Sequence, residues 1–408
     1  MSEEPIDRET GLAAYTRYLL DAAELETGRP GTPAPVAKPH LLVITDYVPT
    51  PDADAGSFRL VHLLALWQEL GHRVTLACDQ PAGNLKYVAD LERLGVTVIT
   101  TSAQVDCHLK NDGARYEVVV LCRPDTALKY LFSTRAYAVR ARVMYDTVDL
   151  HWVRMEGAAR LNPSDPSLAE RAAFYARVEP FVSAMSDVVL TVTEVEKETL
   201  LALNPALRVE VVPCVHPDGP AGAPWSRRKD LLFIGGFWHQ PNVDAVCYFV
   251  EDVLPTVRAA LPDVVFNIIG SNMPDRVKAL ASPSVRPLGF VEDVAPHFLN
   301  SRVFVAPLRF GAGMKGKVGH SMSHGLPVVT TSIGAEGMSL TDGETVMLAD
   351  DPSRFAEAVI RLYTDEAMWT AMSARSRDHI EKHFSIGATK ARLERIFAMP
   401  AAEASHDA

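Results

Sequence analysis

Short, nearly unbroken runs of hydrophobic residues recur along this chain, and they alternate with segments whose hydrophobic residues have helical spacing. The first run is residues 40–45. After a loop rich in Pro and Asp, we expect Ser57 to cap a helix that ends near Gly71 and carries Leu60, Leu63, Leu64 and Trp67. A second run at 72–78 completes a strand–helix–strand unit, which favours parallel strands joined by a right-handed crossover. Continuous apolar strands are typical of sheets covered on both faces.

The same alternation continues through both halves of the chain. Further strands are predicted at 118–121, 143–145, 188–192, 231–234, 264–269, 303–306, 328–331 and 346–348. The loop at 217–224 has the Pro and Gly content of an interdomain hinge, and Asn242 is expected to cap a helix after it. Ligands of open parallel sheets bind beyond the carboxyl ends of the strands. The predicted fold class is therefore α/β, with two Rossmann-like domains whose parallel sheets face each other across a cleft.

The length of 408 residues exceeds one ordinary core and predicts two domains. We place the N-terminal Rossmann-like domain at 39–220 and the C-terminal one at 221–385. Residues 1–38 are interpreted as an appendage, with a helix at 12–25 followed by a Pro-rich linker. Residues 386–408 are interpreted as a helix that crosses back to the N-terminal domain, followed by a tail.

Composition narrows the class of protein. The chain is 48% hydrophobic and 22% charged, no apolar run reaches the roughly 18 residues of a membrane span, and no signal segment is visible at the start. We therefore expect a cytoplasmic protein with no integral membrane segment. The net charge of −11 argues against a nucleic-acid partner. Five widely spaced cysteines favour buried hydrophobes over a zinc site or disulfides.

A glycine-rich segment, Gly311-Ala312-Gly313-Met314-Lys315, links the strand at 303–306 to a helix. Small residues at a helix start let an anion reach free backbone N–H groups. Arg309 and Lys317 flank the segment and, with Lys315, add charge-assisted donors. A diphosphate would fit there. A short glycine motif by itself indicates an ordinary loop as readily as a phosphate site, so other motifs are needed to choose between these two interpretations.

The helix that follows has two distinct faces. Met314, Val318 and Met322 form one stripe, which we interpret as core, and Lys317, His320 and His324 gather on another face, which we interpret as the candidate site.

Polar residues also follow the strand at 143–145, namely Asp146, Asp149 and His151. Their position puts them at the carboxyl edge of the predicted sheet. Asp146 is interpreted equally well as a helix cap or as a site residue. For His151 we favour function, because an imidazole is an apt proton shuttle or hydroxyl partner near neutral pH.

The C-terminal half carries an ordered set of motifs at 233–237, 241–244, 269–271, 289–293, 311–317 and 325–337, and the N-terminal half has looser matches at 51–57, 145–151 and 193–196. Taken together and in order, these motifs resemble the nucleotide-sugar glycosyltransferases of family four, which have the GT-B fold. The resemblance covers residues 40–400.

The resemblance implies transfer of a sugar, as in a hexosyltransferase, from a nucleotide diphosphate sugar to an acceptor, with retention of configuration. No D-x-D motif stands at a strand end, so no metal is expected. The nucleotide sugar is a co-substrate, and no other cofactor is expected. The acceptor is open among a glycan, a lipid, a natural product and a protein.

The resemblance also assigns site residues. Catalytic roles are implied for His151, near the transferred sugar on the acceptor side, and for Lys317 and Arg309 at the departing diphosphate. Donor binding is implied for Gly56, Gly236, Gly270, Phe290, Val291, Gly311, Ala312, Gly313, Met314, Lys315, His320 and Ser321.

One departure from the family pattern concerns the donor ribose. Many members carry two glutamates eight positions apart, the second of which grips the ribose, and the aligned positions here are Ala312 and His320. An imidazole lacks the paired acceptors of a carboxylate. The Arg and Lys that family members usually carry in the first loop of the C-terminal domain are also absent from residues 236–240.

Two alternatives therefore stand beside transfer: a nucleotide-sugar epimerase of the same fold, and a catalytically silent nucleotide-binding module. A dehydrogenase is disfavoured because the first strand lacks a following G-x-G-x-x-G.

Overall fold

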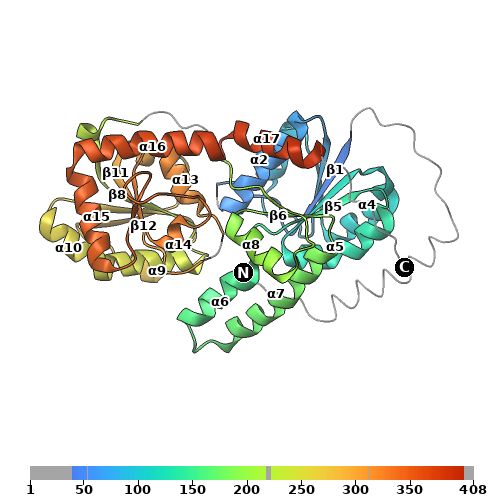
Figure 1. Cartoon of the computed structure of the whole chain (residues 1–408), viewed down its shortest axis with the longest axis horizontal. Coiled ribbons are helices and arrows are strands. Elements are labelled where there is room, and N and C mark those ends of the chain that lie inside the picture. The colour runs from blue at the N-terminus through green and yellow to red at the C-terminus, as the bar shows by residue number, and fades with distance from the viewer. Residues whose placement is uncertain (1–38, 53, 217–221, 312, 399–408) are drawn as a thin grey trace. The chain divides into compact units, whose positions relative to one another are not determined.

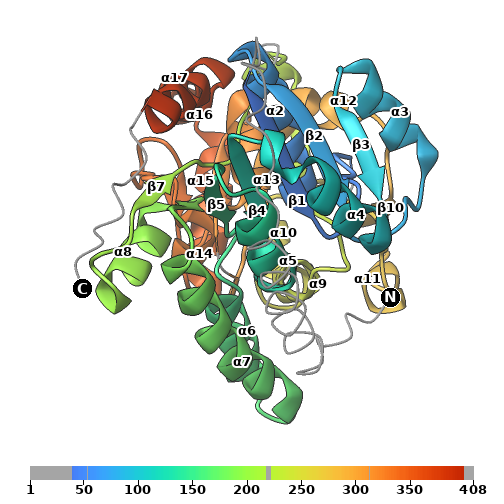
Figure 2. The same ribbon diagram turned by 90° about the vertical axis from the view of Figure 1, so that its right-hand side faces the viewer.

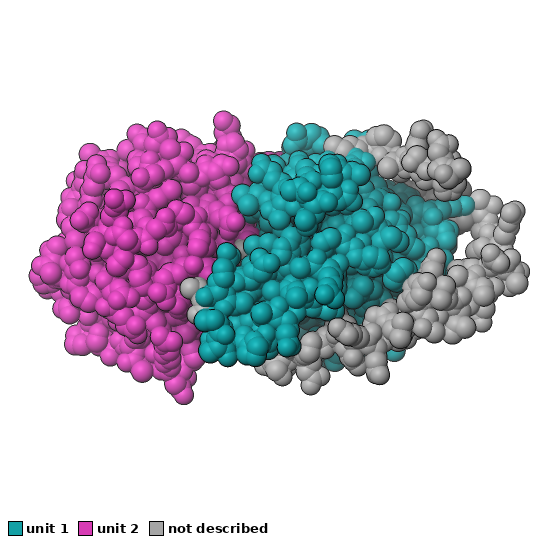
Figure 3. All heavy atoms as spheres, turned by 60° about the horizontal axis from the view of Figure 1, so that its bottom comes forward, with its two compact units in different colours: residues 1–50, 60–212, 390–408 teal, residues 51–59, 213–389 magenta. Residues whose placement is uncertain are grey.

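The computed structural model describes residues 39–52, 54–216, 222–311 and 313–398. The predicted N-terminal helix, the start of the predicted hinge and the C-terminal tail lie outside the described residues. The chain divides into two compact units (Figure 3). Unit 1 comprises the described residues up to Thr50, Leu60–Val212 and those from Lys390 onward, and unit 2 comprises Pro51–Arg59 and Pro213–Thr389.

Unit 1 is built on a parallel sheet in the order β3-β2-β1-β4-β5-β6-β7. Its strands are β1 His40–Thr45, β2 Arg73–Cys78, β3 Thr97–Thr100, β4 Val118–Cys122, β5 Arg142–Asp146, β6 Val188–Thr191 and β7 Val209–Val211. Its helices are most of α2 Ala55–Glu69, α3 Leu85–Arg93, α4 Ser102–Asp112, the 3-10 turn η1 Gly113–Arg115, α5 Pro124–Tyr137, α6 His151–Leu161, α7 Pro166–Ala184, α8 Glu194–Leu203 and most of α17 Ile386–Ala398. Helices α6 and α7 lie side by side (Figure 1 and Figure 2).

Unit 2 is built on a second parallel sheet in the order β10-β9-β8-β11-β12-β13. Its strands are β8 Lys229–Ile234, β9 Phe266–Ile269, β10 Val285–Gly289, β11 Ser301–Ala306, β12 Val328–Thr330 and β13 Met347–Leu348. Its helical segments are η2 Trp225–Arg227, α9 Gln240–Tyr248, the π-turn η3 Phe249–Val253, α10 Leu254–Ala260, α11 Asp275–Lys278, α12 Ala295–Asn300, α13 Gly316–Ser323, α14 Ser332–Ala335, α15 Pro352–Thr364 and α16 Glu366–Phe384. In Figure 1, α16 lies above these strands and α9 below them.

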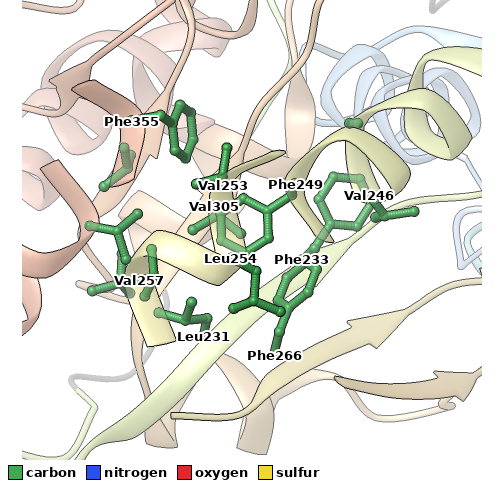
Figure 4. Packing of buried hydrophobic residues seen from close by; sticks show 14 of the residues in the cluster. Leu231, Phe233, Val246, Phe249, Val253, Leu254, Val257, Phe266, Val305 and Phe355 are labelled. Carbon is green, nitrogen blue, oxygen red and sulfur yellow. The ribbon is translucent and has the colours of Figure 1, made fainter. Parts of the chain in front are cut away.

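Each unit has its own hydrophobic core, formed where the apolar strands meet the apolar faces of the helices. In unit 2, Phe233, Phe249, Phe266 and Phe355 are all fully buried, and the rings of Phe249 and Phe266 lie 4.7 Å apart (Figure 4). In unit 1, strands β1 and β4 are buried along their whole length. Burial of both sheet faces accounts for the continuous apolar runs in the sequence.

The α/β class with two parallel sheets is confirmed. The core stripe of the glycine-rich helix is confirmed as well, since Met314 is 8% exposed and Val318 and Met322 are fully buried. Strands β3, β7 and β10 were not predicted. The first two are short and partly exposed, and β10 contains Pro287, so none of them has a continuous apolar run.

Two predicted helix caps are wrong. Ser57 lies inside α2, where its backbone N–H donates to Asp54 Oδ1 at 2.7 Å. Asn242 lies inside α9, whose N-cap is His239, and its side chain serves another purpose described below. Of the two interpretations of Asp146, the helix cap is wrong, because α6 begins five residues later with Leu150 at its N-cap. Within the described residues, no helix is long and apolar enough to cross a membrane.

Candidate functional site

The loops at the carboxyl ends of β8 and β9 approach each other more closely than side chains would permit. A Cβ atom on Gly270 would lie 1.9 Å from the carbonyl oxygen of Gly235 and 2.9 Å from the Phe237 ring. The Gly235 N–H donates to the Ile269 carbonyl at 3.0 Å. Gly270 is therefore needed for the packing of these two loops, which carry the predicted donor-binding glycines of this sheet edge.

The glycine-rich segment follows β11 at the same edge and enters α13. Gly311 and Gly313 have φ angles of 133° and 70°, in the region that favours glycine. Met314 is buried and packs rather than facing outward. Predicted residue Ala312 lies outside the described residues.

Lys315 and Lys317 occupy different environments although only one residue separates them. The Lys315 side chain is 9% exposed, and its amine donates to the Gly313 carbonyl and lies 3.3 Å from Glu336 Oε2. It thus holds the glycine segment to the loop after β12, with its charge balanced by a carboxylate. Lys315 therefore has a structural role in stabilising the conformation of the glycine-rich segment.

Among the described residues, the Lys317 amine contacts only neutral groups. It donates to the Oδ1 atom of Asn242 and lies 4.9 Å from the centre of the Phe233 ring. The Asn242 amide is oriented by its donation to the Gly236 carbonyl at 2.6 Å. Burial and the nearby charge of Lys315 lower the pKa of Lys317 to about 7. An anion placed beside this amine would favour its charged form.

Arg309 is held by a carboxylate on α9. Its Nε donates to Asp244 Oδ2 at 2.9 Å and its Nη2 donates to Oδ1, and the guanidinium lies 4.8 Å from the centre of the Tyr248 ring. The hydrogen bonds to Asp244 raise the pKa of Arg309. The predicted diphosphate contact of Arg309 therefore competes with a bidentate ion pair.

His320 and Ser321 follow on α13. The His320 ring packs against Phe298 at 4.6 Å, against His324 at 4.9 Å and against Phe58 at 6.0 Å, with all four residues in unit 2. Burial and the neighbouring His324 lower the pKa of His320 to about 4, so the ring is neutral near pH 7. Ser321 is fully buried and donates to the Leu326 carbonyl at 2.9 Å, which makes it a structural residue of the helix end.

The remaining predicted donor-binding residues lie in the loop after β10 and in the first turn of α2, all of them in unit 2. Phe290 is 55% exposed, and Val291 beside it is partly buried, directly after β10. Gly56 belongs to the segment Pro51–Arg59, whose Ala55 Cβ lies 3.1 Å from the position of a Cβ on Gly316. The start of α2 therefore packs closely on the start of α13.

His151 belongs to unit 1, at the first position of α6 and 8% exposed. Its Nδ1 lies 3.1 Å from the Asp149 carbonyl oxygen and 3.0 Å from Asp149 Oδ1, and its ring meets the Tyr175 ring edge-on at 5.2 Å. Burial opposes the imidazolium charge, but the charge and hydrogen bond of Asp149 together with the charge of Glu179 more than offset it, so the pKa of His151 is raised. Asp149 also accepts from Arg154 Nε at 2.8 Å.

Two residues that shape these sites were missed at the sequence level. Asn242 was interpreted as a cap, and only the structure reveals its bond to Lys317. Glu179, fully buried in α7, accepts hydrogen bonds from the backbone N–H groups of His151 and Trp152. An acidic residue among the apolar positions of a helix was the available signal for Glu179. Among the described residues, no group of three or more His, Cys, Asp or Glu side chains is arranged to hold a metal ion.

The two α/β units with parallel sheets define a protein of the GT-B class, and the comparisons with known proteins agree. Residues 228–365 match the family model described as glycosyl transferases group 1. TarM has a TM-score of 0.72 with 9% identity, covering 89% of this chain and 99% of TarM. HepE of Anabaena in complex with UDP-glucose has a TM-score of 0.65 with 12% identity, covering 88% of this chain and all of that one. The resemblance to GT-B glycosyltransferases is thereby confirmed.

Two curated relatives match over shorter stretches. An uncharacterized 44.6 kDa protein in the cps region of Klebsiella pneumoniae is 27% identical over 146 residues, which are 32% of this chain and 36% of the relative. The putative glycosyltransferase YtcC of Bacillus subtilis (strain 168) is 28% identical over 109 residues, which are 26% of this chain and 27% of YtcC. The matches thus span only 36% and 27% of the two curated relatives.

Proposed function

We propose that this chain is a metal-independent glycosyltransferase that uses a nucleotide diphosphate sugar as donor and retains the anomeric configuration. The proposal rests on the Lys317 amine, which lies beside the glycine-rich segment at the carboxyl edge of the unit 2 sheet and forms no ion pair with a carboxylate of the described residues. Binding of UDP-glucose by HepE, a protein of the same fold, supports a nucleotide sugar as the donor.

In the proposed reaction, the bond between the anomeric carbon and the diphosphate oxygen breaks, and a bond from an acceptor oxygen or nitrogen to that carbon forms. The acceptor proton passes to a base or to water, and the nucleoside diphosphate leaves with the bonding electron pair. Lys317 stabilises the charge that develops on the diphosphate, and the amides of the glycine-rich segment add hydrogen bonds. His151 binds the sugar or the acceptor hydroxyl.

A nucleotide panel tests the donor site. We expect one nucleoside diphosphate among UDP, GDP, ADP and dTDP to raise the melting temperature, because a ligand that binds only the native state stabilises it. The corresponding nucleotide sugars are then incubated with the protein, and the products are separated by chromatography. Release of diphosphate with a glycosylated acceptor supports transfer.

Two other outcomes decide against transfer. Conversion of the donor without any acceptor indicates the epimerase. Binding with no turnover across a wide acceptor panel indicates the silent module, which the packing of His320 among aromatic rings would favour.

A further inference from the structure

Glu179 of α7 is a carboxylate with no exposed surface, and among the described residues its one ion-pair contact is with His151, whose Nδ1 lies 4.0 Å from Glu179 Oε1. Its Oε1 accepts from the His151 N–H at 3.1 Å and from the Tyr145 hydroxyl at 3.3 Å, and its Oε2 accepts from the Trp152 N–H at 2.9 Å. Burying a carboxylate costs free energy unless hydrogen bonds compensate. Burial raises the pKa of Glu179 to about 7, even though the nearby His151 and these amides oppose that shift. Because burying this carboxylate costs free energy, packing alone does not explain why a Glu occupies position 179.

The hydrogen bonds of Glu179 replace an absent helix cap. The first N–H groups of a helix have no partner within it, and a side-chain oxygen at the N-cap usually accepts from one of them. The N-cap of α6 is Leu150, which has no such oxygen. Glu179 supplies both oxygens from the neighbouring helix, so it fixes the direction of the first turn of α6, where His151 lies.

The loop before α6 is held in a strained conformation. Val148 has a φ of 63°, which is unfavourable for a β-branched residue. A second buried carboxylate, Glu196 of α8, accepts from the N–H groups of Leu150 at 3.0 Å and Val192 at 3.1 Å. The loop thus keeps its strained shape because two carboxylates from two helices hold its end.

Helix α7 also contacts the imidazole itself. Tyr175 lies one turn before Glu179 on the same helix face, and its ring meets the His151 ring edge-on. On its other side, His151 Nδ1 lies against Asp149, so Nε2 is the ring nitrogen that points away from this contact. Asp149 fixes the ring nitrogen, and Glu179 fixes the backbone that carries the ring.

We infer that Glu179 is a positioning residue for His151, which holds the imidazole in the orientation that presents Nε2 to the sugar or acceptor. This inference rests on the proposed function for the role of His151, but not for the coupling between the two residues. Glu179 does not contact substrate in this scheme. It acts through the backbone of α6, as a supporting contact does for a preorganised site.

The test compares Glu179→Gln with Glu196→Gln. Each variant keeps the size of the side chain but turns one acceptor oxygen into an N–H₂ group, which opposes a backbone N–H. Both carboxylates are buried and both accept two backbone amides, so we expect similar losses of stability. Only Glu179 accepts from His151 itself, which makes Glu196→Gln the matched control.

The primary readout is the imidazole NMR signal of His151 in the free protein. Histidine-labelled protein is used, and the signal is assigned by its disappearance in His151→Asn. We expect Glu179→Gln to shift or broaden this signal at a pH well above its titration midpoint, where the ring is neutral in both proteins, with little change in Glu196→Gln. An unchanged signal in Glu179→Gln, or an equal change in both variants, would overturn the inference. If Glu179→Gln does not fold, Glu179→Asp, which keeps the carboxylate one methylene short, is measured in the same way.

Turnover adds a second readout that separates this inference from the proposed function. With the donor found by the nucleotide panel, kcat in Glu179→Gln should fall about tenfold or more at nearly constant KM for the donor, because misplacing a reacting group lowers the rate of the chemical step. A rise in the KM of Glu179→Gln for the donor with an unchanged kcat would contradict the inference that Glu179 positions His151. If the wild-type protein turns over no donor, the proposed function fails while the NMR comparison still decides whether Glu179 positions His151.

Discussion

The Lys317 amine donates to the side-chain oxygen of Asn242, and the Asn242 amide donates in turn to the Gly236 carbonyl at 2.6 Å. These two hydrogen bonds link α13, α9 and the loop after β8 through the neutral Asn242 amide and the Gly236 carbonyl. A carboxylate partner would hold the amine equally well but would neutralise it. Asn242 positions the amine and leaves its charge available for an anionic ligand.

Replacing Lys317 by Ala should therefore weaken nucleoside diphosphate binding strongly. A hydrogen bond to a charged group contributes roughly 1.5–3 kcal/mol, which corresponds to about a 10- to 150-fold increase in Kd. The Kd is measured by isothermal titration calorimetry with the nucleoside diphosphate that gives the largest thermal shift. Lys278→Ala is the matched control, because that lysine is exposed on α11 and pairs with Asp275 at 3.0 Å. Equal Kd values for the wild type and Lys317→Ala would exclude this amine from the phosphate site.

Diphosphate binding should also be coupled to proton uptake. The pKa of Lys317 is lowered to about 7 by burial and by Lys315, and an adjacent diphosphate should raise it again. Above about pH 8 the free amine is largely neutral, so binding must charge it and the Kd should rise as the pH rises from 7 to 9. Titrations in two buffers of different ionisation enthalpy measure the protons taken up. This uptake should disappear in Lys317→Ala, and its persistence there would assign it to another group.

Arg309 should matter less than Lys317 for the diphosphate. Its guanidinium is paired with Asp244 by two hydrogen bonds, and its side chain is 46% exposed. Exposed ion pairs contribute about 0.2–1 kcal/mol to stability. We expect Arg309→Ala to lower stability within that range and to raise the diphosphate Kd less than about fivefold. A loss of affinity as large as that of Lys317→Ala would mean that Arg309 leaves Asp244 when the donor binds.

Gly270→Ala should destabilise unit 2. The new Cβ would lie 1.9 Å from the Gly235 carbonyl oxygen, which is backbone and has no rotamer with which to move away. Overpacking of this kind typically costs about 1–3 kcal/mol, which should appear as a lower melting temperature. Gly83→Ala is the control, since a Cβ there has nothing within 4 Å. A melting temperature of Gly270→Ala equal to that of the control would mean that the two loops separate easily.

The sequence predicted what depends on local pattern. The apolar strands, the glycine-rich segment and the core stripe of Met314, Val318 and Met322 follow from periodicity and small residues within one stretch of chain. The sequence could not predict that Arg309 pairs with Asp244, 65 positions away, or that Asn242 holds Lys317 from 75 positions away. These contacts form only when crossover connections bring separate strand ends to one sheet edge.

The same reason explains why the anchor of His151 was missed. The type and position of His151 after a strand indicated function, but its supporting carboxylate is 28 residues later on another helix. The sequence can indicate a reactive group more easily than the residues that orient it, because orientation comes from tertiary packing.

The last prediction concerns acid stability and His320. Burial and His324 lower the pKa of His320 to about 4, so the folded state favours the neutral ring. For a base with a lowered folded pKa, the stabilisation is complete above the unfolded value of about 6.5 and is lost as the pH falls through 6.5 towards 4. His320→Phe keeps an aromatic ring against Phe298 but cannot titrate. Between pH 7.5 and pH 4.5, we expect the wild type to lose on the order of 2 kcal/mol more unfolding free energy than His320→Phe. Urea unfolding at both pH values measures the difference, and because His324 is present in both proteins, its own titration largely cancels. Parallel pH dependence in the two proteins would show that the His320 ring accepts its proton in the folded state as readily as in the unfolded chain.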